Sequence, residues 1–307
     1  MNINQVEYIV AIADFKSFSK AADHCCVSQP SLSIQITNLE DELNMQLFDR
    51  KSKPIQPTAH GEEIIAQARV VLKEWNNLKA LSNGYSNKIV GSLNLGVIPT
   101  VAPYLVPKFL SNLSQAYPDL HISITELTTS QIKQQLLEGK LDLGILVTPL
   151  EDATLKESPI YYEELLLFSF AKNPSGKFVE EIIPEKLWLL EEGHCLSSQI
   201  NFICNLRNLK PKAANFIYKS GSLETIVRLA KDAEGQTIVP QMLCDYLTDD
   251  LKDNIFPILP AKPYREVSIV HGQNFVRKAV LRAIIDEIKK IVPVEWTQAK
   301  NRNIIPI

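Results

Sequence analysis

Two cysteines, Cys195 and Cys204, stand nine residues apart in the second half of the chain. Thiols at so short a separation can be oxidised and joined, so the pair predicts a redox switch. If the segment between them is helical, nine residues give a rise of about 13.5 Å and a turn of about 180°, which places the sulfurs on opposite faces. A disulfide needs Cα atoms roughly 4.4 to 6.8 Å apart, so joining this pair would require the segment to unwind or fold back. Oxidation would then change the shape of the protein.

Cys195 has a setting that favours reaction, because it follows an apolar stretch and Gly193 where a helix can begin. Unpaired N–H groups and the positive end of the helix dipole stabilise a thiolate at such a position, and thiolate is the form that attacks peroxide. The alternative is that both cysteines are small buried hydrophobic residues, a common fate of free Cys. We expect that role for the remaining three, Cys25, Cys26 and Cys244.

Composition limits the classes of protein that this chain can belong to. Its 307 residues, 45% of them hydrophobic, predict two or three folded units. No run approaches the roughly 18 apolar residues of a membrane span, and the amino terminus does not resemble a secretion signal, so we expect a cytoplasmic protein without membrane contact. No Cys or His cluster has zinc-site spacing, and no phosphate loop, carboxylate pair or nucleophile elbow stands out. We therefore expect no metal, no cofactor and no enzymatic activity.

Three short helices separated by turns are predicted in the first 60 residues. The second begins near Ser19, and the third opens at Ser28 with Pro30 in its first turn, where a missing N–H costs little. Leu32, Ile36, Leu39 and Leu43 repeat at helical spacing and define the buried side of the third helix.

The opposite side of the third helix can enter the major groove of DNA, and a basic hairpin after it can contact phosphates. Net charge does not support this reading, because residues 1–88 hold nine Lys/Arg against ten Asp/Glu. The candidate DNA-binding residues are Ser28, Gln29, Pro30, Ser31, Ser33, Ile34, Thr37, Asn38, Arg50, Lys51 and Lys53.

A longer helix follows, whose apolar residues are spaced four, three, four and three apart, as in a seam that pairs two helices. Packing of this helix on its own domain is the alternative. From residue 91 the pattern changes to apolar stretches alternating with helical segments, which predicts an α/β unit. The seam residues are Ile64, Ala68, Val71, Trp75 and Leu78, and the predicted strands include 93–97, 122–124, 143–146, 165–170, 188–190, 237–239 and 267–270.

The segments Gln29–Ser33, Leu47–Arg50 and Thr58–Gly61 resemble the winged helix-turn-helix of LysR-type transcriptional regulators. The resemblance implies a linker helix that forms a dimer and assembly of the regulator into a homotetramer. It implies an activator that contacts RNA polymerase. It also implies an α/β effector domain of two subdomains similar to periplasmic solute-binding proteins. The expected domains are 1–58 for DNA binding, 59–88 for the linker helix and hinge, and 89–307 for the effector, with one subdomain in about 89–162 and 267–307 and the other in about 163–266.

Within that family the segments Gly96–Thr100, Pro103–Leu105 and Leu190–Cys195, together with Cys204, resemble the peroxide-sensing members. This resemblance implies that Cys195 is the peroxide-reactive thiol and Cys204 the resolving thiol. It further implies that Thr100, Thr129 and His194 bind and orient hydrogen peroxide, which is the signal.

Several positions depart from the family pattern. Ser197 and Ser198 replace a basic and an acidic residue that relatives often carry between the two cysteines. Where the family commonly supplies an arginine near the thiolate, this chain has His271. The recognition helix has Ile34, Thr37 and Asn38 where relatives often have basic residues, so its phosphate anchoring or base readout should differ.

Two other functions fit the same residues. A LysR-type regulator could sense a small organic effector in the cleft between its subdomains, with incidental cysteines. A thiol peroxidase would need the reactive cysteine but neither the helix-turn-helix nor the paired linker helix, and repeated turnover of peroxide would distinguish it.

Overall fold

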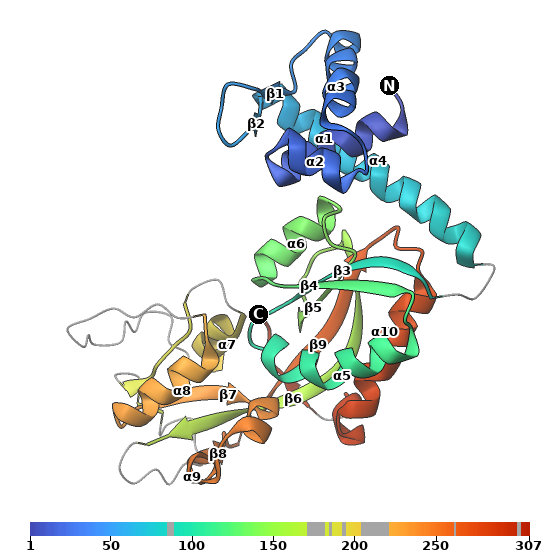
Figure 1. Cartoon of the computed structure of the whole chain (residues 1–307). Coiled ribbons are helices and arrows are strands. Elements are labelled where there is room, and N and C mark those ends of the chain that lie inside the picture. Colours follow the sequence, from blue (N-terminus) through green and yellow to red (C-terminus); the bar gives the residue numbers. More distant parts are fainter. Residues whose placement is uncertain are drawn as a thin grey trace. The chain divides into compact units, whose positions relative to one another are not determined.

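The structure is a computed structural model that describes residues 1–84, 89–170, 182–183, 186–191, 195–203, 221–260, 262–299 and 302–307 (Figure 1). Two residues predicted to take part in sensing, His194 and Cys204, lie outside the described residues. The chain divides into two compact units. The first contains Met1–Lys88 with Leu137–Lys140, and the second contains Ile89–Leu136 with Leu141–Ile307.

The first unit contains the expected three helices and a two-stranded hairpin. The second helix begins two residues earlier than the sequence indicated, because Ser17 rather than Ser19 caps it by accepting a hydrogen bond from the Lys20 N–H. Ser28 caps the third helix as predicted, accepting from Ser31 at 3.3 Å. The elements are α1 (Ile3–Phe15), α2 (Phe18–His24), α3 (Gln29–Leu43), β1 (Phe48–Asp49), the antiparallel β2 (Gln56–Pro57) and α4 (Ala59–Gly84).

The apolar repeat of α3 forms the centre of the first unit's core. Leu32, Ile36 and Leu39 are fully buried and pack with residues of α1 such as Ile9 and Ile12. Burial of side chains of this size stabilises the fold by about 1.5 to 3 kcal/mol each, so the register of α3 is firmly set. The other side of α3 consequently faces away from the core.

Helix α4 packs on its own unit near its start and leaves the later part of its predicted seam exposed. Near its start Ile65 and Ala68 are buried in the core of the first unit. Further along, Val71 and Leu78 are 43% and 60% exposed, and Trp75 is exposed as well. The predicted seam is therefore half intramolecular and half free on the surface of this unit.

The second unit is built on a mixed sheet with the strand order β4-β3-β5-β9-β6-β7. Strands β3, β4 and β5 are parallel, whereas β9 runs antiparallel to both β5 and β6. The α/β prediction is confirmed. The strands are β3 (Gly91–Val97), β4 (Leu120–Glu126), β5 (Leu143–Thr148), β6 (Leu155–Ser169), β7 (Gln236–Pro240), β8 (Ile255–Pro257), β9 (Pro263–Gly272) and β10 (Asn303–Ile304).

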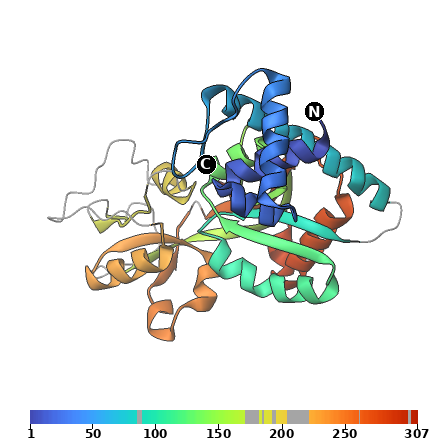
Figure 2. The same cartoon turned by 45° about the horizontal axis from the view of Figure 1, so that its top comes forward.

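Helices cover the sheet on both sides, with α6 on one face and the adjacent α5 and α10 on the other (Figure 1, Figure 2). Gly144 and Gly96 allow α6 to approach, since a Cβ would lie 2.5 Å from the Ile132 side chain at Gly144 and 3.0 Å from it at Gly96. The helices are α5 (Ala102–Ala116), α6 (Thr129–Leu137), α7 (Cys195–Ile203), α8 (Leu223–Asp232), α9 (Asp249–Lys252) and α10 (Lys278–Ile291), with 3₁₀ turns η3 (Gln241–Tyr246) and η4 (Val294–Thr297).

Strand β6 changes partners along its length. From Leu155 to Glu164 it pairs with β9, and from Leu165 to Ser169 it pairs with β7, while Leu166–Phe168 also pair with β8. The strand thus connects the two groups of strands, as the ribbon shows (Figure 1). The change of partner at Glu164 places Glu163 at the junction between the groups.

One segment of the second unit differs from its predicted conformation. The apolar run 188–190 is not a strand, because only Leu187 beside it makes an isolated bridge to Gln236. Its side chains instead pack on the core. Among the described residues, no helix combines the length and apolar character needed to cross a bilayer.

Candidate functional site

Cys195 is the first residue of α7 and is buried. The start of the helix is tied to the preceding segment by Ser197, whose Oγ donates to the Leu190 carbonyl oxygen at 2.6 Å. The serine that departs from the family pattern therefore has a local structural role, while Ser198 is exposed. The sulfur is held inside the second unit rather than on its surface.

Arg265 of β9 is a neighbour of this thiol that the sequence did not reveal. Its side chain is almost completely buried, and Nη1 donates to Thr100 Oγ1 at 2.9 Å. Its Nη2 donates to the Thr100 carbonyl oxygen at 3.0 Å. The charge of the guanidinium lowers the pKa of the Cys195 thiol. Arg265 and Thr100 thus form one charged and hydrogen-bonded wall of the site.

An arginine therefore lies beside the thiol, although the position that the resemblance assigned to an arginine holds His271. His271 lies six residues further along the same strand, where Nδ1 is 2.8 Å from the Gly272 carbonyl oxygen and the ring lies against Phe275. Arg265 and Glu266 are adjacent charged residues in this strand, but the strand alone does not reveal which groups lie across it from either of them.

Glu163 of β6 holds Arg265 from the side opposite Thr100. The two residues are direct partners in the β6–β9 register. Glu163 Oε1 accepts from Arg265 Nε at 2.9 Å and lies 2.7 Å from Nη2, and Oε2 accepts from the Met242 N–H at 2.9 Å. Because both side chains are excluded from water, the pair leaves no uncompensated charge in the interior.

The Cys195 thiol is subject to opposing influences. Burial is the largest and raises its pKa, because a thiolate loses hydration in the interior. Arg265, the hydroxyls of Thr129 and Thr100, and the Leu196 N–H all lower the pKa. The Leu196 N–H at the helix start lowers the pKa as expected, but burial outweighs it, so the net effect raises the pKa of the thiol.

Thr129, the first residue of α6, completes the described surroundings of the sulfur. Its Oγ1 is buried and has no oxygen or nitrogen partner within the described ranges. Its interaction with Cys195 lowers the pKa of that thiol. The structure therefore brings together Cys195, Thr100 and Thr129, three of the five residues predicted for sensing. The other two, His194 and Cys204, lie outside the described residues.

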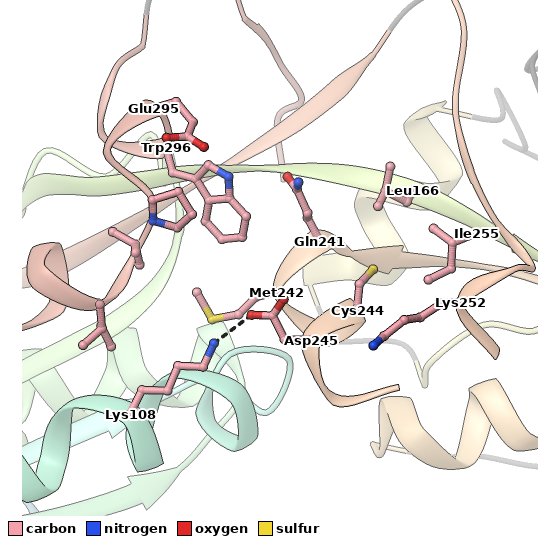
Figure 3. Close-up of a pocket in the computed structure, with 13 residues that line it drawn as sticks. Lys108, Leu166, Gln241, Met242, Cys244, Asp245, Lys252, Ile255, Glu295 and Trp296 are labelled. Carbon is pink, nitrogen blue, oxygen red and sulfur yellow. Dashed lines mark hydrogen bonds and ion pairs between the residues drawn. The ribbon is translucent and has the colours of Figure 1, made fainter. Parts of the chain in front are cut away.

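Cys244 of η3 differs from Cys195 although both are enclosed. Burial, Glu163 and Asp245 raise the pKa of the Cys244 thiol to about 12. It lines a pocket of about 770 Å³ formed by α5, β6, η3, α9, β8 and the end of α10 with η4. Figure 3 shows Lys108 and Lys252 pointing into this pocket opposite Trp296, with Lys108 Nζ 2.9 Å from Asp245 Oδ2. In the described part of the chain, no group of His, Cys, Asp and Glu is arranged to hold a metal ion.

The outer face of α3 matches the predicted DNA-binding face in its exposure. Most of the residues named for it are exposed, and Ser33 is half-buried. The largest apolar group on this face is Ile34, which is 60% exposed. The exposed residues are Ser28, Gln29, Pro30, Ser31, Ile34, Thr37 and Asn38.

The three basic residues after α3 differ in their contacts: the two lysines are exposed, whereas the arginine forms an ion pair. Lys51 and Lys53 are exposed in the hairpin between β1 and β2. Arg50 instead joins the hairpin to α3, because Nη2 lies 2.7 Å from Glu40 Oε2 and donates to Thr37 Oγ1 at 3.0 Å. Its guanidinium also lies over the Phe18 ring. Arg50 therefore has a structural role that the sequence did not indicate.

Both units match family models. Residues 3–62 match the bacterial regulatory helix-turn-helix protein model of the lysR family, and residues 86–292 match the LysR substrate binding domain. The chain belongs to the LysR family of transcriptional regulators. Membership of this LysR family makes it a DNA-binding regulator, and the family is a class of transcription factors rather than of enzymes.

Individual LysR-family proteins extend this comparison over the whole chain. A hydrogen peroxide-inducible genes activator of Haemophilus influenzae is 33% identical over 302 residues, covering 95% of this chain and 99% of that protein. The DNA-binding transcriptional dual regulator OxyR of Escherichia coli is 35% identical, covering 88% and 89%. A full-length OxyR variant from Pseudomonas aeruginosa superposes with a TM-score of 0.79 at 28% identity, covering 96% and 99%. The chain is therefore a LysR-type regulator similar to OxyR.

Proposed function

We propose that this regulator is a peroxide-responsive activator that is switched when Cys195 is oxidised and bonds to Cys204. The observation that carries the proposal is the burial of Cys195 beside Arg265, Thr100 and Thr129, with Arg265 itself bonded to Thr100. Burial raises the pKa of the thiol, and these three groups oppose that rise. A buried sulfur with a cation and two hydroxyls beside it is poorly explained as an inert hydrophobic residue.

The chemistry has two steps. The Cys195 thiolate attacks one oxygen of hydrogen peroxide, so that an S–O bond forms, the O–O bond breaks and hydroxide leaves; sulfur is oxidised and peroxide is reduced. The Cys204 thiolate then attacks the sulfenic sulfur, which forms the disulfide and releases the second oxygen as hydroxide, and protonation gives water. Thr100 and Thr129, with His194, are proposed to bind and orient peroxide for the first step.

The helix after Cys195 supports a change of shape in the second step. Helix α7 runs from Cys195 to Ile203, so Cys204 follows its last residue. A nine-residue helix rises about 12 Å between its ends, well beyond the Cα separation of a disulfide. Formation of the bond therefore requires α7 to unwind, at least in part.

The remaining parts of the proposal concern assembly and output. We propose a homodimer formed through the exposed part of α4, in the cytoplasm where DNA is available, and a homotetramer as the working assembly. Unwinding of α7 would reorient effector units divided near residues 163 and 266, change the spacing of the paired helix-turn-helix units, and so alter contact with RNA polymerase.

Peroxide titration of the full-length protein tests the sensing proposal and the absence of catalysis. Intact mass should fall by two hydrogens per chain with one equivalent of peroxide, and peptide mapping should link Cys195 to Cys204. The C195S variant should consume no peroxide through this pair. Continued consumption of many equivalents in the presence of a thiol reductant, at enzymatic rate, would instead identify a peroxidase.

A small organic effector remains a second candidate signal because of the pocket in Figure 3. Its volume of about 770 Å³ is within the range of sites for small ligands, and its wall combines apolar side chains with two lysines. The Met242 N–H connects this wall to Glu163 and therefore to Arg265. Under this alternative, a DNA footprint would change with ligand alone in the C195S/C204S variant, whereas under the redox proposal that variant is locked in one footprint.

A further inference from the structure

Ile34 occupies the centre of the outward face of α3. It lies four residues after Pro30, three before Thr37 and four before Asn38, so these side chains share one face. The isoleucine side chain is 60% exposed, whereas Leu32, Ile36 and Leu39 on the other face are fully buried. It takes no part in the core of the first unit.

The recognition helix has no positive charge of its own. Between Gln29 and Leu43 the sequence contains neither Lys nor Arg, and its last turns carry Glu40, Asp41 and Glu42. The nearby Arg50 is engaged by Glu40 and by the Thr37 hydroxyl. The bidentate contact of an arginine with guanine, the commonest specific contact in the major groove, is therefore not available from α3.

The hydroxyl of Thr37 is also occupied. Thr37 Oγ1 donates to the Ser33 carbonyl oxygen at 3.1 Å and accepts from Arg50 Nη2. This leaves the Ile34 side chain as the largest group at the middle of the face. Thymine is the base that presents a methyl group in the major groove, and apolar side chains contact it there.

We propose that Ile34 determines specificity by packing against the 5-methyl group of one thymine in each half-site. The inference rests on the proposed insertion of α3 into the major groove of DNA. It goes further by naming thymine as a base that this helix recognises. Because the side chain supplies shape and apolar area without hydrogen bonds, discrimination at this position depends on the methyl group itself. Removal of either the isoleucine side chain or the methyl group should have the same effect.

The test begins with selection of duplex sites by the full-length protein from a random library. Each thymine of a selected site is then replaced by deoxyuridine, which removes only the methyl group. We expect one symmetry-related pair of positions at which binding weakens by about fivefold per methyl contact. The I34A variant should bind the thymine site weakly and should not distinguish thymine from uracil at that pair.

The V294A variant is the matched control, because Val294 is an apolar side chain 72% exposed in the other unit. It should keep the wild-type response to uracil. A second measurement uses the wild-type protein alone, so that its result does not depend on the folding of I34A. At the sensitive position, the wild-type protein should bind a duplex with a 5-methylcytosine·guanine pair more tightly than one with a cytosine·guanine pair. The inference would be overturned if uracil at every position left wild-type binding unchanged. It would also be overturned if I34A still bound the uracil site more weakly than the thymine site. Failure of wild type to bind any duplex would overturn the DNA-binding role of α3 itself.

Discussion

The Arg265 guanidinium and the Glu163 carboxylate form a buried ion pair across β9 and β6, with 2.7 Å between Nη2 and Oε1. The same guanidinium contacts Thr100 and lowers the pKa of the Cys195 thiol, while the same carboxylate accepts the Met242 N–H. The Cys195 thiol is therefore connected through one charged pair to both groups of strands in the second unit. Changes to either member should affect stability and reactivity together.

Removal of the charge of Arg265 should strongly destabilise the second unit. The R265M variant leaves the Glu163 carboxylate buried without its cation, so we expect a loss of about 3–5 kcal/mol in the free energy of unfolding. The double variant E163L/R265M should recover much of that loss, because both charges are gone. Urea unfolding monitored by Trp fluorescence measures both. A surface control, K231M, removes an exposed pair with Asp250 and should lower the free energy of unfolding far less than R265M does. A double variant no more stable than R265M would contradict the argument.

Reaction of Cys195 should increase with pH. Burial raises its pKa, so the thiol is mainly protonated at neutral pH, and alkylation by iodoacetamide should accelerate by up to about tenfold per pH unit until the raised pKa is reached. Quantitative peptide mapping measures the rate at each cysteine. Cys244, with its pKa raised to about 12, should react more slowly than Cys195 throughout. A rate at Cys195 that does not vary between about pH 6 and 9 would mean that the thiolate already prevails.

The same raised pKa has a consequence for stability. Folding favours the neutral thiol, so the contribution of Cys195 is complete below the unfolded-state pKa of about 8.5 and is lost as the pH rises through the higher folded-state value. In unfolding curves measured at alkaline pH, C195S should therefore lose less stability than wild type. Equal losses in the two proteins would contradict this linkage.

Lys51 and Lys53 should contribute to DNA binding through phosphates alone. Each is exposed in the hairpin, so K51A or K53A should weaken binding to specific and non-specific duplexes alike and reduce the slope of log K against log salt by about 0.9. Arg50 should behave differently, because R50A also removes the pair with Glu40 and so lowers the melting temperature of the first unit. Fluorescence anisotropy at several salt concentrations, with thermal unfolding alongside, distinguishes the two classes. Lysine variants with unchanged salt slopes would show that the hairpin does not contact DNA.

The exposed part of α4 should hold the dimer together. Because Leu78 is 60% exposed, L78E should leave the fold intact but place a charge within the proposed seam, giving monomers by size-exclusion chromatography with light scattering. V294E introduces the same charge at another exposed apolar position and should remain a dimer. Dimers of undiminished stability in L78E would exclude this face of α4 as the contact.

Local sequence patterns predicted the first unit well. Leu32, Ile36 and Leu39 repeat at helical spacing and Ser28 caps the helix, and both features depend on residues close together in the chain. The start of α2 was misplaced by two residues because Ser17 and Ser19 are equally suitable caps by residue type, and only the backbone conformation decides between them. The run 188–190 was mistaken for a strand since buried apolar segments look alike whatever their conformation.

The sequence by itself determined the register of the recognition helix, because that register follows from apolar residues at short, regular spacing. It also carried the local motifs whose resemblance to LysR-type regulators indicated the class of the protein and its candidate sensing thiol. Only the tertiary structure decided that Arg265 lies beside Cys195, that Glu163 faces that arginine, and that Arg50 is bound to Glu40. Glu163 and Arg265 are 102 residues apart and meet through the pairing of β6 with β9. The balance between burial and charge at the sulfur likewise depends on packing from several elements, which no local pattern encodes.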